Sequence, residues 1–348
     1  MQVLIIKAQI NMIKFQPDPG MKESHHSELI QYVKKDFPVT CGVYLFFGSA
    51  GCVIYVGKSL NIRNRLLNHL RQKKEEGFLW KGILSDDTSF VKYIVTNDEL
   101  IALVIEDKLI KIHRPLYNVR QKHYQKYKYL GITNGLFPGI KVYGHSQQIK
   151  NRLIFGPFKN RLQIEMLITL IQRYFRLRIC NDASPLLKCL YHDIELCRGP
   201  CTGDILPFAY TSVVNDVIHF LNGNVDEVFQ ALNGDLNFSL SSLKFEGADE
   251  IRKMMDFCLA YSKKMTYYNL FKNKTLVIFN KVTGEIKCRF NQGRMNHFAD
   301  DADILLMDSG ILDSEHHSFF DPRILLDRCD IIYNWLNRHS NEFEYHFQ

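Results

Sequence analysis

Residues 41–70, CGVYLFFGSAGCVIYVGKSLNIRNRLLNHL, constrain the fold of this 348-residue chain more than any other stretch. They open with two apolar runs, GVYLFF and CVIYVG, on either side of the turn sequence GSAG. Two such runs around a glycine-containing turn predict a β-hairpin. Pairing Phe47 with Cys52 across the turn places Tyr44 opposite Tyr55, so both hydroxyls project from the same face of the sheet.

A helix is predicted directly after this hairpin. Lys58 lies at its start, and Asn61, Arg65 and His69 follow at intervals of four residues, which places them on one side of the helix. With the two tyrosines, these residues converge beside one edge of the sheet, an arrangement suited to handling a phosphodiester. Each residue alone also has a structural interpretation, since strand tyrosines commonly pack in cores and basic helix residues are commonly solvated.

A third strand is predicted over residues 89–95, followed by a second helix. Thr96 and Glu99 have the spacing of a capping box, which marks the helix start. The sequence LIALVIEDKLIKIH then continues the helix to the residue before Pro115.

Glu106 lies within the apolar surface of this second helix. A carboxylate is costly there unless it pairs with a cation or a metal. One interpretation is an ion pair with Arg65 or Lys58. The other is a metal site, since Mg²⁺ commonly uses one or two protein carboxylates together with phosphate oxygens.

These motifs resemble the GIY-YIG nuclease domain of the UvrC family, with valine for isoleucine in both GVY and YVG. The resemblance implies an α/β domain with a small antiparallel sheet flanked by helices, which hydrolyses DNA with Mg²⁺ or Mn²⁺. It implies Glu106 as the metal ligand and Tyr55 as the general base, and we expect Lys58 to lower the pKa of that tyrosine. The full predicted catalytic set is Tyr44, Tyr55, Lys58, Arg65, His69, Glu106 and Asn118, with Arg65 as the phosphate clamp. The role of His69 is open, because UvrC members often carry tyrosine there.

The segment over residues 114–129 carries five Lys or Arg, four tyrosines and no acid, in a chain of net charge +7. Basic residues interleaved with aromatics predict a surface that follows a nucleic-acid backbone. A solvated linker is the alternative. The predicted DNA-binding residues are Arg63, Arg114, Arg120, Lys122, Lys126 and Lys128.

The sequence IFGPF at residues 154–158, which follows a short predicted sheet, and a helix over residues 161–180 continue the UvrC-like order. The helix has an apolar stripe that indicates a packing role: Leu162, Met166, Leu167, Leu170, Ile171 and Phe175.

Four cysteines fall within 22 residues, beginning at the last residue of this helix: Cys180, Cys189, Cys197 and Cys201. Thiolates at this density bind Zn²⁺ or an iron–sulfur cluster, although a lone cysteine is more often a small buried apolar residue. The resemblance to the cysteine region of UvrC favours a [4Fe–4S] cluster over zinc. His192 is a possible substitute ligand.

Residues 213–261 have a helical pattern that breaks at Gly223. The stretch over residues 240–258 resembles the UVR motif that pairs with UvrB, although an ordinary amphipathic helix is equally compatible. A hairpin with its turn at residues 282–284, an acidic stretch at residues 299–310 and a helix over residues 322–336 complete the chain, without a recognisable catalytic constellation.

We therefore predict five segments: an N-terminal extension (1–35), the GIY-YIG domain (36–122), a connecting region with the cysteines (123–205), a helical UVR-like region (206–265) and a small C-terminal α/β region (266–348). No residues remain for the RNase H-like nuclease of a full-length UvrC, so the architecture resembles Cho-type members of the family.

That resemblance implies a monomeric endonuclease acting with UvrB, and indirectly UvrA, on damaged double-stranded DNA. It would make the 3′-side incision of nucleotide excision repair. Nine cysteines without a signal peptide and without a membrane span indicate the reducing cytoplasm. The alternatives are a stand-alone structure-specific or mobile-element nuclease and a catalytically inactive DNA-binding adaptor.

Overall fold

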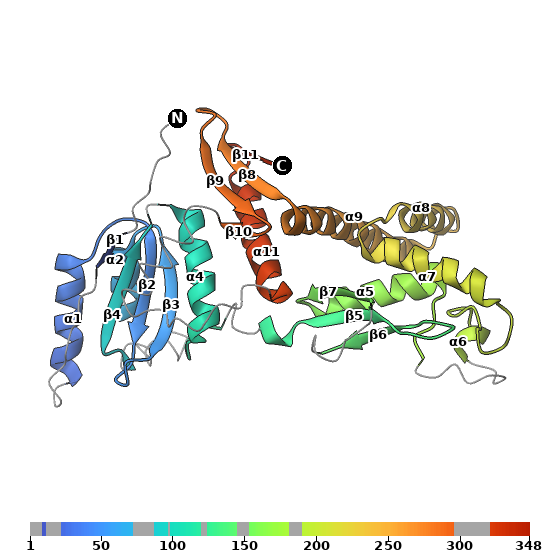
Figure 1. Cartoon of the computed structure of the whole chain (residues 1–348), viewed down its shortest axis with the longest axis horizontal. Coiled ribbons are helices and arrows are strands. Elements are labelled where there is room, and N and C mark those ends of the chain that lie inside the picture. Colours follow the sequence, from blue (N-terminus) through green and yellow to red (C-terminus); the bar gives the residue numbers. More distant parts are fainter. Residues whose placement is uncertain are drawn as a thin grey trace. The chain divides into compact units, whose positions relative to one another are not determined.

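The computed structural model describes residues 9–11, 22–71, 87–96, 98–119, 124–144, 153–180, 190–295 and 321–348. The chain divides into two compact units, Met1–Tyr124 with Lys274–Gln348, and Gln125–Asn273. Both combine helices with small antiparallel sheets, which confirms the predicted α/β class (Figure 1). Within the described residues, every helix is too short or too polar to cross a lipid bilayer.

The first unit begins with a four-stranded sheet in the order β1-β4-β2-β3. Its strands are β1 (Gln9–Asn11), β2 (Gly42–Phe47), β3 (Val53–Ser59) and β4 (Phe90–Val95). Its helices are α1 (Lys22–Asp36), α2 (Ile62–Arg71) and α4 (Glu99–His113). Figure 1 shows α4 on the opposite side of the sheet from α1. Because both faces are covered, every residue of the inner strand β2 is buried, while β3 forms an edge of the sheet.

The predicted hairpin of β2 and β3 is present, but the predicted register is wrong. Tyr44 pairs with Gly57, and Phe46 pairs with Tyr55. The pairing is therefore displaced by two positions from the one that places the two tyrosines directly opposite each other. A displacement of two positions keeps each side chain on its original face. Tyr44 and Tyr55 consequently share one face as predicted, with ring centroids 6.1 Å apart.

Two local features of the hairpin explain the displacement. Gly48 and Cys52 hydrogen-bond across the turn, so the loop contains one residue fewer than the predicted loop. Gly51 closes this loop at a φ of 75°, a left-handed conformation that glycine adopts without strain. A β-bulge between Phe46 and Phe47 then inserts one extra residue into β3. Neither feature could be read from the alternation of apolar residues.

The predicted capping box at the start of α4 is also wrong. Asp98 is the N-cap, and its carboxylate accepts a hydrogen bond from the backbone N–H of Ile101 at 3.0 Å. Thr96 still belongs to the end of the sheet, because its backbone N–H donates to the carbonyl of Cys41. The helix therefore begins at Glu99, later than the capping box requires.

The C-terminal part of the first unit is a second sheet with one helix. The sheet has the order β10-β9-β8-β11, from β8 (Thr275–Asn280), β9 (Ile286–Asn291), β10 (Arg294–Met295) and β11 (Phe343–Phe347). Helix α11 (Pro322–Arg338) contacts α4. The predicted hairpin turn is confirmed, with Gly284 at a φ of 68°. The acidic stretch at residues 299–310 lies outside the described residues.

The second unit has a three-stranded sheet in the order β6-β5-β7 and a set of helices around one core. The strands are β5 (Lys128–Ile132), β6 (Ile140–Tyr143) and β7 (Leu153–Phe158). The helices are α5 (Arg161–Leu170), with a π-helical turn η3 (Ile171–Phe175), then α6 (Leu190–Asp193), α7 (Pro207–Leu221), α8 (Asp226–Ser241) and α9 (Phe245–Asn273). A short 3₁₀ helix, η1 (Tyr124–Lys126), precedes β5.

Four predictions for the second unit can be compared with the structure. Leu162, expected in the apolar stripe of the first helix, is exposed, and Ile164 is buried instead. The break at Gly223 is confirmed, with a φ of 101°. The UVR-like stretch is divided by a turn at Leu243, after which α9 begins. The predicted segment boundary at residue 266 falls inside α9, and the five-segment division stays a prediction.

Candidate active site

Four of the predicted site residues meet beside β3. The Tyr44 hydroxyl lies 3.0 Å from Nε2 of His69, and both residues are buried. The Tyr55 ring lies beside both, with its centroid 6.1 Å from that of Tyr44 and 5.4 Å from that of His69, and the Arg65 guanidinium is near enough to lower the pKa of Tyr44 in part. Strand β2, strand β3 and helix α2 therefore bring the two phenols, the guanidinium and the imidazole together as the sequence predicted.

Gly57, the glycine of YVG, is required by Tyr44. A Cβ atom at position 57 would lie 2.4 Å from the Tyr44 hydroxyl oxygen, closer than carbon and oxygen can approach. The phenol thus passes directly over the backbone of the neighbouring strand. Sequence reasoning treated this glycine only as part of a motif, and the register of the hairpin is what reveals its function.

Glu106 reaches the same edge from α4. Its Oε1 accepts a hydrogen bond from the backbone N–H of Lys58 at 3.0 Å. Among the described residues, no basic side chain lies within ion-pair distance of this carboxylate, so the alternative pairing with Arg65 or Lys58 is absent. Burial raises the pKa of Glu106 to about 7, against the lowering effects of the Lys58 hydrogen bond and charge. A divalent cation, which prefers oxygen ligands, would compensate the buried negative charge of the Glu106 carboxylate.

The Lys58 ammonium forms an ion pair with a carboxylate other than that of Glu106. It lies 2.5 Å from Oε1 of Glu99, the first residue of α4. The expectation that Lys58 lowers the pKa of Tyr55 is wrong for this arrangement, because burial and then the charge of Glu106 raise that pKa. Glu99 was not among the predicted site residues, and nothing in its sequence position distinguishes it from any acidic residue in a first helical turn.

Asn118 holds the edge strand in place. Its side-chain carbonyl accepts a hydrogen bond from the Val56 backbone N–H at 2.9 Å, and its amide donates to the Val56 carbonyl at 2.8 Å. The buried amide thus satisfies both backbone groups as a further strand would. Asn61 lies just before α2, where its side chain accepts from the Asn64 backbone N–H, and not on the helix face as predicted.

The described residues among the predicted DNA-binding set are divided between the two units. Arg63 donates from Nε to the Phe37 carbonyl at 2.6 Å, a contact that links α2 to the residue after α1. Arg114 is exposed beyond α4, and its NH2 lies 3.5 Å from the Tyr124 hydroxyl. Lys126 and Lys128 are exposed in the second unit. Arg120 and Lys122 lie outside the described residues.

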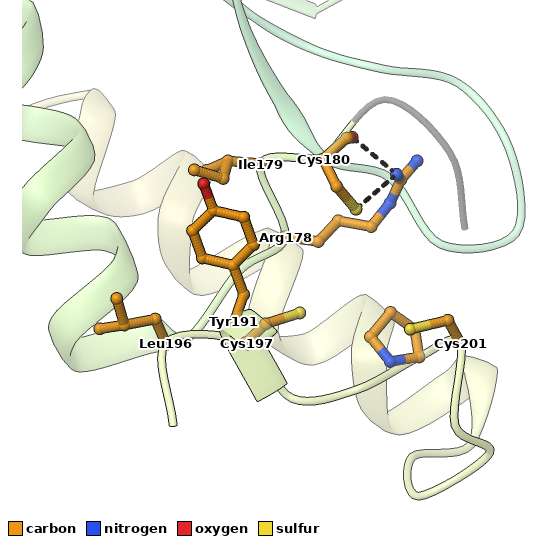
Figure 2. Close-up of a pocket in the computed structure, with 8 residues that line it drawn as sticks. Arg178, Ile179, Cys180, Tyr191, Leu196, Cys197 and Cys201 are labelled. Atoms are coloured by element: carbon orange, nitrogen blue, oxygen red, sulfur yellow. Dashed lines mark hydrogen bonds between the residues drawn. The ribbon is translucent and has the colours of Figure 1, made fainter. Parts of the chain in front are cut away.

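Three of the four clustered cysteines line one pocket of the second unit. Cys180, Cys197 and Cys201 contribute to its wall, and Figure 2 shows their sulfur atoms facing the same space. A guanidinium nitrogen of Arg178 lies 3.6 Å from the Cys180 sulfur. Cys189 lies outside the described residues.

Metal ligation by these cysteines stays a prediction. No three His, Cys, Asp or Glu side chains of the described segments gather closely enough to hold a metal ion. His192, the possible substitute ligand, has its Nε2 3.1 Å from a carboxylate oxygen of Asp204.

Comparison with known proteins gives two family matches. Residues 40–119 match the UvrC-like GIY-YIG domain, and residues 127–220 match the UvrC/Cho excinuclease middle domain. Neither match covers residues 274–348. The first matched region lies in the first unit and the second lies in the second unit.

Several relatives are named UvrABC system protein C. The protein from Thermoanaerobacter sp. (strain X514) is 31% identical over 260 residues, covering 73% of this chain and 42% of the relative. The protein from Clostridium novyi (strain NT) is 30% identical over 316 residues, covering 88% and 48%. The chain therefore spans less than half the length of these relatives.

A solved structure is similar over the nuclease region. It is a point mutant of the GIY-YIG N-terminal endonuclease domain of UvrC from Thermotoga maritima, bound to the catalytic divalent cation. It is 31% identical, the similarity covers 29% of this chain and all of that one, and the TM-score is 0.24.

Proposed function

This chain belongs to the UvrC family, and on that premise we propose that it is a metal-dependent endonuclease that cuts damaged DNA on the 3′ side of the lesion, guided by UvrB. The observation that carries the proposal is the meeting of Tyr55, Arg65 and Glu106 at the open edge of β3. A base, a phosphate-binding cation and a metal-binding carboxylate are the groups that phosphodiester hydrolysis requires.

The proposed division of labour follows the geometry. Tyr55, in its phenolate form, takes a proton from a water molecule and becomes the neutral phenol, while the water oxygen attacks phosphorus. The bond between phosphorus and the 3′ oxygen breaks, and that oxygen acquires a proton from solvent. Arg65 binds the phosphate through its planar pair of N–H donors. A divalent cation held by Glu106 would polarise the phosphate and stabilise the leaving oxygen.

The pKa values support different roles for the two tyrosines. Burial raises the pKa of Tyr44 well above its ordinary value, so Tyr44 stays protonated and orients its neighbours. The pKa of Tyr55 is raised by burial and by the charge of Glu106. Neutralisation of that carboxylate charge by a cation would remove the second effect and lower the pKa of Tyr55, so that a larger fraction of Tyr55 would be the phenolate that can accept a proton.

The middle-domain match favours the repair function over a stand-alone nuclease, since the family likeness continues beyond the nuclease domain. We propose that the UVR-like stretch contributes to binding UvrB, and that UvrA acts only indirectly. We place the protein in the cytoplasm as a monomer. All described cysteines are free thiols, as a reducing compartment requires.

We further propose that Cys180, Cys189, Cys197 and Cys201 hold a [4Fe–4S] cluster or Zn²⁺ in the second unit. Support comes from the shared pocket of the three described cysteines. Anaerobically purified protein should carry about four irons and four sulfides, or one zinc. Joint substitution Cys197→Ser and Cys201→Ser should release the metal and expose residues 190–205 to protease. Metal-free wild-type protein with the protease pattern of the variant would contradict the proposal.

The decisive functional experiment is incision of a lesion-bearing duplex with and without UvrB. Cutting on the 3′ side that requires UvrB supports the proposal, because phosphate contacts position a nuclease without locating damage. Lesion-selective cutting by the chain alone, or preference for undamaged branched DNA, would favour a stand-alone nuclease. Binding without cutting under all conditions would favour the inactive adaptor.

A further inference from the structure

The first turn of α4 contacts the C-terminal part of its own unit. Asp98, the N-cap, pairs with the ammonium of Lys287 on β9. Glu99 Oε2 lies 3.6 Å from Nε2 of His339, the residue directly after α11. Residues 274–348, which neither family match covers, therefore reach the start of the helix that carries Glu106.

The last turn of α4 is held by the same part of the chain. Lys111 lies 2.6 Å from Asp107 and 2.9 Å from Asp327 of α11, and all three side chains are at most 3% exposed. An ion pair this dry has a fixed geometry, since water cannot compete for either partner. Both ends of α4 are thus anchored to residues 274–348.

Glu99 connects this anchor to the candidate active site. Its Oε2 faces His339, while its Oε1 accepts a hydrogen bond from Lys58 at 2.5 Å. The Glu99 side chain is 17% exposed. Burial raises its pKa, but the hydrogen bond and charge of Lys58, and then the charges of Arg338 and His339, outweigh burial and lower it. The carboxylate is therefore charged at neutral pH and shared between the two contacts.

Two residues of one helix face bind the same lysine. Glu106 follows Glu99 by two helical turns, so both lie on the same side of α4. Glu106 accepts the backbone N–H of Lys58, and Glu99 accepts its side-chain ammonium. The long lysine side chain carries considerable rotamer entropy, and an ammonium has three donors. With one donor directed to Glu99, the other two are available to a phosphate.

We propose that Glu99 is a positioning residue that holds Lys58 at the nuclease site, and that His339 of the C-terminal part holds Glu99. This inference rests on the proposed nuclease function. In this proposal, contacts from residues 274–348 hold α4 in place. The orientation of Lys58 therefore depends on a region outside the matched nuclease domain.

The first test needs no substrate. The full chain is treated with a limiting amine-reactive reagent, and mass spectrometry compares modification of Lys58 with that of the exposed Lys253. Glu99→Gln keeps the side-chain size but removes the charge, and we expect at least threefold faster modification of Lys58. His339→Ala should give a smaller increase. Glu344→Gln, an exposed carboxylate on β11, is the matched control and should give none.

The second test is a double-mutant cycle in single-turnover incision with UvrB and Mg²⁺. Glu99→Gln should slow incision about tenfold without weakening DNA binding. The same change in a Lys58→Met background should slow it less than twofold, because the positioned group is already absent. An equal loss in both backgrounds would indicate a purely structural role and overturn the proposal.

The two tests separate this proposal from the proposed function. Unchanged modification of Lys58 in Glu99→Gln overturns it, as does faster modification without slower incision. If His339→Ala changes neither the modification of Lys58 nor the incision rate, the proposed role of His339 and of residues 274–348 is overturned. If the wild-type chain never cuts DNA, the nuclease function fails, and the modification rates still decide whether Glu99 holds Lys58.

Discussion

Glu106→Gln should stabilise the metal-free chain at neutral pH. The glutamine retains the size of the side chain and the oxygen that accepts the Lys58 backbone N–H. In the folded chain, burial raises the pKa of Glu106 from its ordinary value of 4.5 to about 7. Between these pH values the folded chain retains a proton that the unfolded chain has lost. The free energy of unfolding therefore falls as the pH rises through this window.

The magnitude follows from the size of the shift. At 1.36 kcal/mol per pH unit, a difference of about 2.5 units corresponds to ~3 kcal/mol. The glutamine variant lacks this cost, so its advantage over wild type should grow from near zero at about pH 4.5 to ~3 kcal/mol at about pH 8. A divalent cation at about 100 times its dissociation constant should raise the free energy of unfolding of the wild type by ~2.7 kcal/mol and leave that of the variant unchanged.

Urea unfolding from pH 5 to 8, in EDTA and then in Mn²⁺, measures these differences. Tryptophan fluorescence is the appropriate signal, since Trp335 of α11 belongs to the same unit as Glu106. Glu344→Gln is the control and should follow the wild-type profile. Parallel pH profiles for wild type and Glu106→Gln in EDTA would refute the reasoning, because they would show that the carboxylate titrates as in the unfolded chain.

Three further predictions concern the same unit. Tyr55→Phe keeps the ring and removes the base, so single-turnover incision should slow by about 10²–10⁴-fold; a loss below threefold would make Tyr55 a packing residue. Gly57→Ala should displace Tyr44 and cost about 1–3 kcal/mol in urea unfolding, with an unchanged midpoint counting against the close approach. Lys111→Met leaves the buried carboxylates of Asp107 and Asp327 without their shared cation and should cost about 3–5 kcal/mol; a loss under about 1 kcal/mol would show that the three groups do not form one network.

The parts of the fold that local pattern dictates were predicted from the sequence. Apolar alternation and a glycine turn are sufficient for the hairpin, and the same parity places Tyr44 and Tyr55 on one face. Four-residue spacing similarly places Arg65 and His69 together on α2. Glu106 stood out because an acid in an apolar helix surface needs a compensating partner.

The remaining features depend on contacts between residues far apart in sequence. The bulge in β3 and the clamp of Asn118 on Val56 follow from tertiary packing, and neither leaves a local signal. The same is true of Glu99, whose importance comes from Lys58 on one side and His339 on the other. Contacts of this kind become visible only when residues 274–348 are seen in the same unit as the nuclease domain.

The most direct test of the account compares wild type and Glu106→Gln on one lesion-bearing duplex loaded with UvrB. We predict that the wild type cuts once, on the 3′ side of the lesion, in Mg²⁺ and not in EDTA. The variant should bind the same complex with equal affinity and cut it at least ~10³-fold more slowly, since the carboxylate that holds the cation is gone. Incision by the variant at a near wild-type rate in Mg²⁺, or incision by the wild type in EDTA, would contradict the account.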